Sequence, residues 1–190
     1  VLLREVPFDG DGNFSWERFE ERYTADLANA YGNLASRAMA MVEKYCDGVV
    51  PTAARPEAEQ EDDTDLAAYH AAMHGENGWL LHEGLAAVYR MAQRANEYTA
   101  ATTPWAVAKD PSRRAELEQI LASLIRRVAK QTVLYAPFMP NKAQQVWAQL
   151  GGPGNVADQR VTNLDSLDPS GWKVSKGDIL FPRPTSEKPA

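Results

Sequence analysis

The amino-acid sequence predicts an all-α fold, an antiparallel helical bundle with an irregular C-terminal extension. Three observations support this prediction. Apolar residues recur at helical spacing through several long segments, glycine and proline residues separate those segments, and residues 151–190 lose the helical period. We therefore expect three parts: a connecting segment over residues 1–14, the bundle over 15–150 and the extension over 151–190.

The first helix is expected to begin at Ser15, whose hydroxyl is suited to cap a helix N-terminus. Farther along, apolar residues alternate at spacings of four and three, which is typical of one face of an amphipathic helix. The members of this face are Leu27, Tyr31, Leu34, Ala38, Met41 and Tyr45. Gly48 is expected to end the helix in a left-handed conformation, and Pro51 follows just beyond it.

An acidic segment follows the first helix. Six acidic residues and no basic ones lie between Glu57 and Asp65. Because prolines precede them, residues 51–65 are expected to form an exposed, mobile connection outside any binding site. These six residues also account for the net charge of −6, since removing them leaves 20 acidic and 20 basic residues. Such a balance argues against strong nonspecific nucleic-acid binding by the whole surface, but it permits a local basic face.

The remaining helices are predicted from the same kind of pattern. A short helix is expected within residues 66–75, and a stronger one runs from Leu81 through residue 100. Pro104 and Trp105 then interrupt the pattern. The clearest helix follows, with Asp110 as its cap and Pro111 in its first turn. Its apolar face contains Leu117, Ile120, Leu121, Leu124, Ile125 and Val128.

The last predicted helix has Asn141 as its cap and Gly151 as its stop. Beyond it, glycine and proline residues exclude another long helix. The stretch "GDILFPR", residues 177–183, is compatible with either a short strand or an extended tail.

Signals for catalysis and metal binding are weak in these 190 residues. His70 and His74 are four residues apart, as paired zinc ligands on a helix often are, but a third ligand is not evident. A solvated helix face is the favoured interpretation of that pair. Cys46 is interpreted as an inert, half-buried thiol. Without a phosphate-binding glycine motif either, no catalytic residue and no metal site are predicted, and the chain by itself does not resemble an enzyme.

The bulk composition points to the cytoplasm. The longest apolar run falls far short of the roughly 20 residues that span a bilayer, and the N-terminal stretch lacks a signal-peptide pattern. The single cysteine cannot form an internal disulfide, which fits a reducing compartment. Because the chain begins with Val1 rather than methionine, we expect the natural protein to be longer.

Two features suggest binding rather than catalysis. Asn33 and Arg37 are four residues apart and therefore neighbours on one helix face, where an amide and a guanidinium offer groups that read base edges. An ordinary polar pair within a helix is the alternative, and the residues alone favour it. Trp105 is either a partly buried core residue or a ring displayed for stacking.

Several motifs resemble the anticodon-binding region of methionyl-tRNA synthetases, which are class I aminoacyl-tRNA synthetases. The resemblance is carried by "GNLASR" (32–37), "TTPWAVAKD" (102–110) and "APFMP" (136–140), and it covers nearly the whole chain in matching order. It implies the helical-bundle fold of that region and a catalytic domain from which residues 1–14 lead into the bundle. It also implies that Asn33 and Arg37 contact the first bases of a CAU anticodon, and that Trp105 stacks on an anticodon base.

The resemblance has clear limits. The family's nucleotide-binding catalytic fold has no counterpart here, and the stretch "KVSKG" lies after the bundle, so its lysines, Lys173 and Lys176, are interpreted as tail residues. Phosphate contacts are expected from charge and position alone, with a solvated helix surface as the alternative. The candidates are Arg90, Arg94, Lys109, Arg113 and Arg114.

The expected function is therefore recognition of the CAU anticodon in tRNA(Met). The chain would position this tRNA for aminoacylation by a catalytic domain that these residues lack, and would be inactive alone. The resemblance implies ATP and Mg²⁺ as cofactors of the whole ligase, none in this part, and the tRNA stem-loop and the catalytic domain as partners. The alternative is a stand-alone tRNA-binding or protein-interaction bundle without ligase activity.

Overall fold

A computed structural model describes residues 1–5, 15–75, 79–175 and 177–182. The described chain is helical without strands, which confirms the all-α prediction. Its α-helices are α1 (Leu2–Glu5), α2 (Trp16–Arg22), α3 (Asn33–Cys46), α4 (Glu61–Met73), α5 (Leu81–Thr102), α6 (Pro104–Val107), α7 (Arg114–Tyr135) and α8 (Pro140–Leu150). A π-helix, η1 (Tyr23–Gly32), joins α2 to α3, and the short 3-10 turns are η2 (Glu57–Glu59), η3 (Pro111–Arg113), η4 (Val156–Asp158) and η5 (Val161–Ser166).

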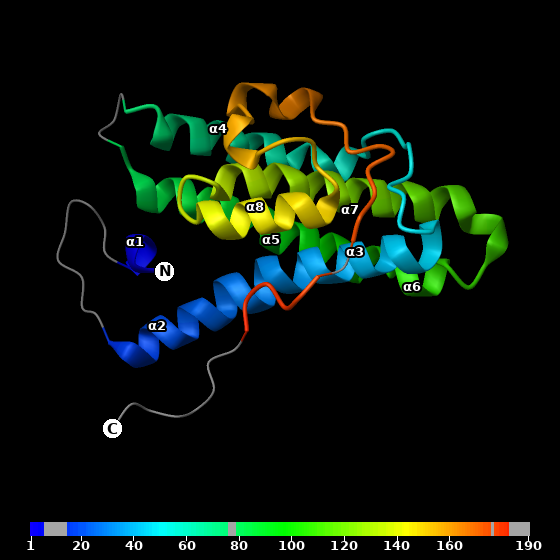
Figure 1. The fold of residues 1–190 in the computed structure, drawn as a ribbon, viewed down its shortest axis with the longest axis horizontal. Coiled ribbons are helices and arrows are strands. Elements are labelled where there is room, and N and C mark those ends of the chain that lie inside the picture. The colour runs from blue at the N-terminus through cyan, green and yellow to red at the C-terminus, as the bar shows by residue number, and fades with distance from the viewer. Residues whose placement is uncertain (6–14, 76–78, 176, 183–190) are drawn as a thin grey trace.

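The first helix runs without interruption through α2, η1 and α3 (Figure 1). The Ser15 hydroxyl accepts a hydrogen bond from the backbone N–H of Arg18, which confirms the predicted cap. At the other end, Asp47 has φ 53° and Gly48 has φ 75°, so two successive left-handed residues stop the helix. Gly48 thus behaves as predicted.

Helix α7 forms the centre of the bundle (Figure 1). The six apolar residues predicted to form its face are all buried. Burial extends to every residue from Ile120 to Tyr135, because α3, α5, α8 and the turns of the extension all pack around it. A helix covered on all sides does not have the single apolar stripe of a surface helix. Polar residues such as Gln131 and Thr132 are therefore buried as well.

The structure contradicts the prediction that the acidic segment is an exposed, mobile connection, since only three of its six acidic residues are exposed. Glu59, Asp62 and Asp65 are 1%, 3% and 4% exposed, and they lie in η2 and α4, ordered elements packed on the bundle. Each is paired with arginine: Glu59 with Arg126, Asp62 with Arg127 and Arg94, and Asp65 with Arg90 and Arg94. The buried carboxylates are tolerated because their charges are matched from α5 and α7.

Burial and pairing act in opposite directions on Asp62. Burial raises the pKa of its carboxyl above the ordinary aspartate value, while Arg127 and Arg94 counteract part of that rise. We call the group formed by Glu59, Asp62, Asp65, Arg90, Arg94, Arg126 and Arg127 the buried ion network.

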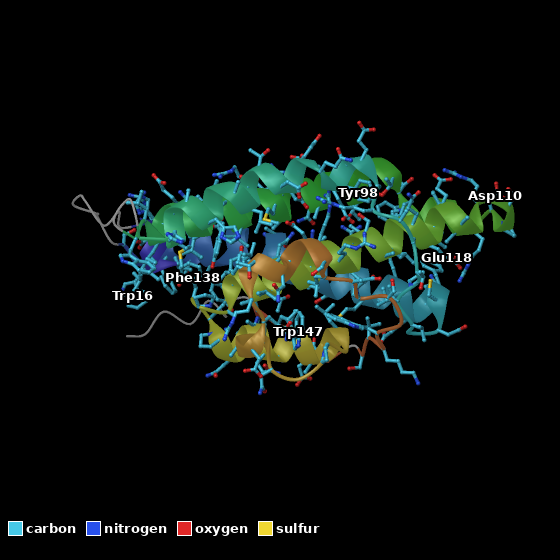
Figure 2. All side chains as sticks on the ribbon, turned by 90° about the horizontal axis from the view of Figure 1, so that it is seen from above. Trp16, Tyr98, Asp110, Glu118, Phe138 and Trp147 are labelled. Carbon is cyan, nitrogen blue, oxygen red and sulfur yellow. The ribbon has the colours of Figure 1, made fainter. Side chains whose placement is uncertain are left out.

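The C-terminal extension is irregular, as predicted, but it is packed against the bundle. Val156, Leu164, Val174, Leu180 and Phe181 are buried in the common core. The rings of Trp172 and Trp147 pack edge to face at a centroid distance of 5.0 Å. Trp147, on α8, is labelled in Figure 2.

Two details of the C-terminal predictions change. Asn141 does not cap α8, because Met139 is the cap residue and Pro140 occupies the first turn, which needs no N–H there. Gly151 does end the helix, with φ 78°. The stretch 177–182 forms no strand, and the described chain contains only an isolated bridge between Val49 and Lys173. Residue 183 lies outside the described residues.

Candidate nucleic-acid interface

Asn33 and Arg37 lie one turn apart on the exposed side of α3. The opposite side of the helix is anchored in the core by Leu34, Ala38 and Val42, which are at most 2% exposed. Because buried residues on one face determine how the helix is rotated, the two polar side chains must point to solvent. The predicted proximity of Asn33 and Arg37 is therefore present in the structure.

Trp105 is presented by a short, constrained turn. Thr103 has φ 43°, a left-handed conformation that is rare for a β-branched residue. Its carbonyl accepts hydrogen bonds from Ala106 and Val107, and Pro104 and Val107 are buried as anchors of α6. The Trp105 side chain remains 41% exposed. Backbone strain of this kind persists only where surrounding contacts hold it, and it is frequent at binding sites.

Arg37 joins the two elements into one surface. The central carbon of its guanidinium lies 5.3 Å from the centroid of the Trp105 ring, within the range of a cation–π contact. Arg37 is itself exposed, and it makes no ion pair within the described part of the chain. An exposed indole, an arginine without a carboxylate partner and an amide thus follow one another along the molecule. We call Asn33, Arg37 and Trp105 the polar–aromatic face.

A further residue, Asn96 on α5, contacts the backbone just before α3, the helix that carries Asn33 and Arg37. Its side-chain amide donates to the carbonyl oxygen of Ala30 at 3.1 Å, and the backbone N–H of Asn33 donates to the same oxygen. The π-helix before α3 therefore has a side-chain donor from another helix at its end. Sequence reasoning did not identify Asn96. An asparagine in the middle of a helix, where this residue is unfavourable, was the available signal.

Most of the predicted phosphate contacts are engaged within the protein. Arg90 and Arg94 belong to the buried ion network, so their charge is balanced by Asp65 and Asp62. A phosphate would have to compete with these carboxylates for either arginine. Charge and position alone could not indicate this pairing, because the acidic segment was expected to lie apart in solvent.

The other three candidates differ from one another. Arg113 pairs with Glu116 at 2.6 Å, and Arg114 pairs with Glu118 at 2.7 Å and donates to the Tyr45 carbonyl. Lys109 is exposed, lies four residues after Trp105, and makes no ion pair with any described residue. It is therefore the cation best available to a phosphate beside the polar–aromatic face.

The turn after Lys109 is held by the predicted helix cap. Asp110 accepts hydrogen bonds from the backbone N–H and the hydroxyl of Ser112, and these bonds hold the pKa of its carboxyl below the usual range. Pro111 occupies the first turn, as predicted, although that turn is of the 3-10 type.

The weak catalytic candidates do not form a site. Among the described residues, no group of three or more histidine, cysteine, aspartate or glutamate side chains could hold a metal ion. Cys46 is buried, and burial raises the pKa of its thiol despite the Arg114 guanidinium nearby. A thiol that stays protonated is a poor nucleophile. In the described part of the chain, no helix is both long and apolar enough to cross a membrane.

Comparison with known proteins places this geometry in context. Residues 47–190 match the family model of the anticodon binding domain of methionyl tRNA ligase, and residues 1–39 match the model of class I tRNA synthetases of the methionine type. Similar curated proteins include the methionine–tRNA ligases of Streptomyces coelicolor and Caldanaerobacter subterraneus, at 42% and 38% identity. Those alignments cover 100% and 98% of this chain but only 37% and 30% of the two relatives.

Solved structures agree. The free form of Mycobacterium tuberculosis methionyl-tRNA synthetase is similar to this chain with a TM-score of 0.85 at 29% identity, over 97% of this chain and 38% of that one. The chain thus spans 30% to 38% of the length of these three relatives. It belongs to the methionine–tRNA ligase family, and within that family it corresponds to the part that carries the anticodon-binding domain.

Proposed function

We propose that this chain recognises the CAU anticodon of tRNA(Met) through the polar–aromatic face formed by Asn33, Arg37 and Trp105. The observation that carries the proposal is the contact of the Arg37 guanidinium with the exposed Trp105 ring, beside Asn33. Its setting in a domain that matches the family's anticodon-binding model supports it.

The chemistry of the face suits bases that have been unstacked from an RNA loop. Single-stranded RNA is recognised by stacking on aromatic rings or guanidinium planes together with hydrogen bonds to base edges. Trp105 offers the ring. Arg37, held against that ring, brings five N–H donors, and the Asn33 amide brings both donors and an acceptor. The face therefore combines a sequence-tolerant stacking surface with groups that discriminate between bases.

In the whole protein, this binding would orient the tRNA so that its 3′ end reaches a catalytic domain. We propose that the protein is an ATP-dependent methionine–tRNA ligase of the cytoplasm, and that its catalytic domain holds ATP and Mg²⁺. A solved relative, the Mycobacterium tuberculosis enzyme, is in complex with methionyl-adenylate. The match of residues 1–39 to the synthetase model favours this proposal over a stand-alone bundle. The 190-residue chain alone is expected to be inactive in methionine-dependent ATP–pyrophosphate exchange.

The test is titration of the chain with anticodon stem-loops. Trp105→Ala should weaken binding of the CAU stem-loop by about 1–3 kcal/mol, because one base loses its stacking surface. Trp16→Ala is the matched control, since Trp16 is 69% exposed and lies at the opposite end of the bundle from Asp110 (Figure 2). It should leave the affinity unchanged. Equal affinities of the wild type and Trp105→Ala, or equal binding of CAU and altered anticodons, would contradict the proposal.

A further inference from the structure

The π-helix η1 changes into the α-helix α3 at Asn33. The backbone N–H of Asn33 donates to the carbonyl oxygens of both Ala28 and Ala30, so its hydrogen bond is shared between a π-type partner and a tighter one. A π-type hydrogen bond spans one residue more than an α-type bond, and each residue of an α-helix turns the side-chain direction by about 100°. The place at which η1 ends therefore determines the direction of the Asn33 side chain.

A side chain from another helix forms a hydrogen bond at this junction. The Asn96 amide, on α5, donates to the Ala30 carbonyl oxygen at 3.1 Å and to the Ala92 carbonyl oxygen, one turn back on its own helix, at 2.9 Å. Because both partners are acceptors, only the amide nitrogen can serve them, and it uses its two N–H groups to do so. The Ala30 carbonyl thus has two donors, one from its own helix and one from α5.

The two helices that Asn96 connects carry the two parts of the polar–aromatic face. Asn33 and Arg37 belong to α3, whereas Trp105 follows the end of α5. The relative placement of these helices therefore determines whether the amide and the ring can meet neighbouring bases. Asn96 is half-buried and lines a small hollow together with Arg37. It thus lies where α5 packs beneath the exposed side chains of α3.

We propose that Asn96 is a positioning residue for anticodon recognition. By bonding to the Ala30 carbonyl oxygen, it fixes the end of η1 and with it the direction of the Asn33 side chain relative to Trp105. The inference rests on the proposed function. Without the Asn96 amide, Asn33 would spend part of its time in other orientations, and the apparent affinity for RNA would fall with the fraction of molecules in the binding orientation.

The test is a double-mutant cycle on the 190-residue chain, with the CAU stem-loop as the probe. Asn96→Ala should weaken binding about two- to tenfold, the range expected when the equivalent of one hydrogen bond is lost. Asn33→Ala should weaken binding at least as much. In the Asn33→Ala chain, Asn96→Ala should have no further effect on affinity, because Asn96 acts through the Asn33 side chain.

Tyr31→Phe is the matched control. The Tyr31 hydroxyl shares a buried hydrogen bond of 2.7 Å with Thr132, which also fastens η1 to another helix but does not involve the Ala30 carbonyl. Tyr31→Phe should lower the urea midpoint of unfolding and leave the affinity for the CAU stem-loop unchanged. Asn96→Ala should still fold, since alanine is more favourable than asparagine inside a helix. The control therefore separates a loss of stability from a loss of positioning.

Three results would overturn the positioning role: unchanged affinity of Asn96→Ala, an equal loss of affinity in Tyr31→Phe, or an effect of Asn96→Ala that persists in the Asn33→Ala chain. Failure of the proposed function has a different signature. In that case neither Asn33→Ala nor Trp105→Ala would weaken binding of the CAU stem-loop.

Discussion

Arginine serves two purposes in this molecule, and the contrast between two regions shows how. In the buried ion network, Arg127 and Arg126 are 1% and 7% exposed, and their guanidinium groups face carboxylates of η2 and α4. On the polar–aromatic face, Arg37 is exposed and rests on an indole ring. The same side chain connects helices in one region and remains available to a ligand in the other.

Pairing, not the number of charges, therefore indicates which cations are available to RNA. Arg94 donates to both Asp62 and Asp65, and a phosphate would have to compete with two carboxylates already in place. Arg37 and Lys109 have no such competitor within the described chain. A protein with a net charge of −6 can therefore carry an RNA-binding face, provided that its acidic residues are paired elsewhere.

The largest expected effect comes from breaking the network. Arg127→Ala leaves Asp62 buried with a single arginine partner and removes the stacking of the guanidinium over the Tyr98 ring, 5.1 Å from its centroid. Removing one partner of a buried pair costs about 3–5 kcal/mol of unfolding free energy. Urea unfolding followed by circular dichroism measures it. Glu116→Ala, which breaks only the exposed pair with Arg113, is the control and should cost less than about 1 kcal/mol. Similar losses of unfolding free energy in the two variants would mean that the buried ion network stabilises the fold no more than an exposed ion pair does.

A smaller effect concerns how firmly α4 is packed. Tyr69 is 2% exposed and donates to the Leu134 carbonyl, and burial raises the pKa of its phenol to about 12. Because the folded-state pKa lies above the unfolded value of about 10, the stability that Tyr69 contributes is complete below pH 10 and is lost as the pH rises toward 12. That loss amounts to about 2–3 kcal/mol.

Tyr69→Phe checks this. The variant should be about 1 kcal/mol less stable at pH 7, because the buried hydrogen bond is gone, and its stability should fall less steeply than that of the wild type between pH 10 and 12. Denaturant midpoints measured across that range provide the comparison. Parallel alkaline curves would mean that Tyr69 is solvated in the folded state and that α4 is loosely attached.

Helix positions and ends could largely be predicted from the sequence, because they depend on local patterns. Ser15, Gly48, Asp110 and Gly151 act through neighbours within a few residues, and each was recognised from its own surroundings. The apolar face of α7 was recognised for the same reason. The cap of α8 was misplaced by two residues, since both Pro140 and Asn141 are common near helix starts.

The packing of the acidic segment and of the C-terminal extension could not be predicted, because both depend on partners far away in the sequence. Asp62 pairs with Arg94 and Arg127, which lie 32 and 65 residues farther along the chain. Without these partners in view, the composition of the acidic segment resembles that of a solvated loop. Phe181 packs against Gly32 only because the C-terminal extension folds back onto the first helix. The pair Asn33 and Arg37 was visible as a helical spacing, but its contact with Trp105 required the turn at Thr103.

The smallest predicted effect is on the salt dependence of RNA binding, which should differ between a cation without an ion-pair partner and one that is already paired. Each phosphate contact contributes about one unit to the slope of log K against log salt concentration. Lys109→Ala should therefore reduce that slope by about one for the CAU stem-loop, whereas Arg90→Ala should leave it unchanged, since Asp65 already balances that charge. Both side chains are exposed, so the two variants match in accessibility and in the charge they remove. Binding measured at several salt concentrations decides between them. Equal reductions would show that RNA draws Arg90 away from Asp65, and then the number of surface cations, rather than their pairing, would govern binding.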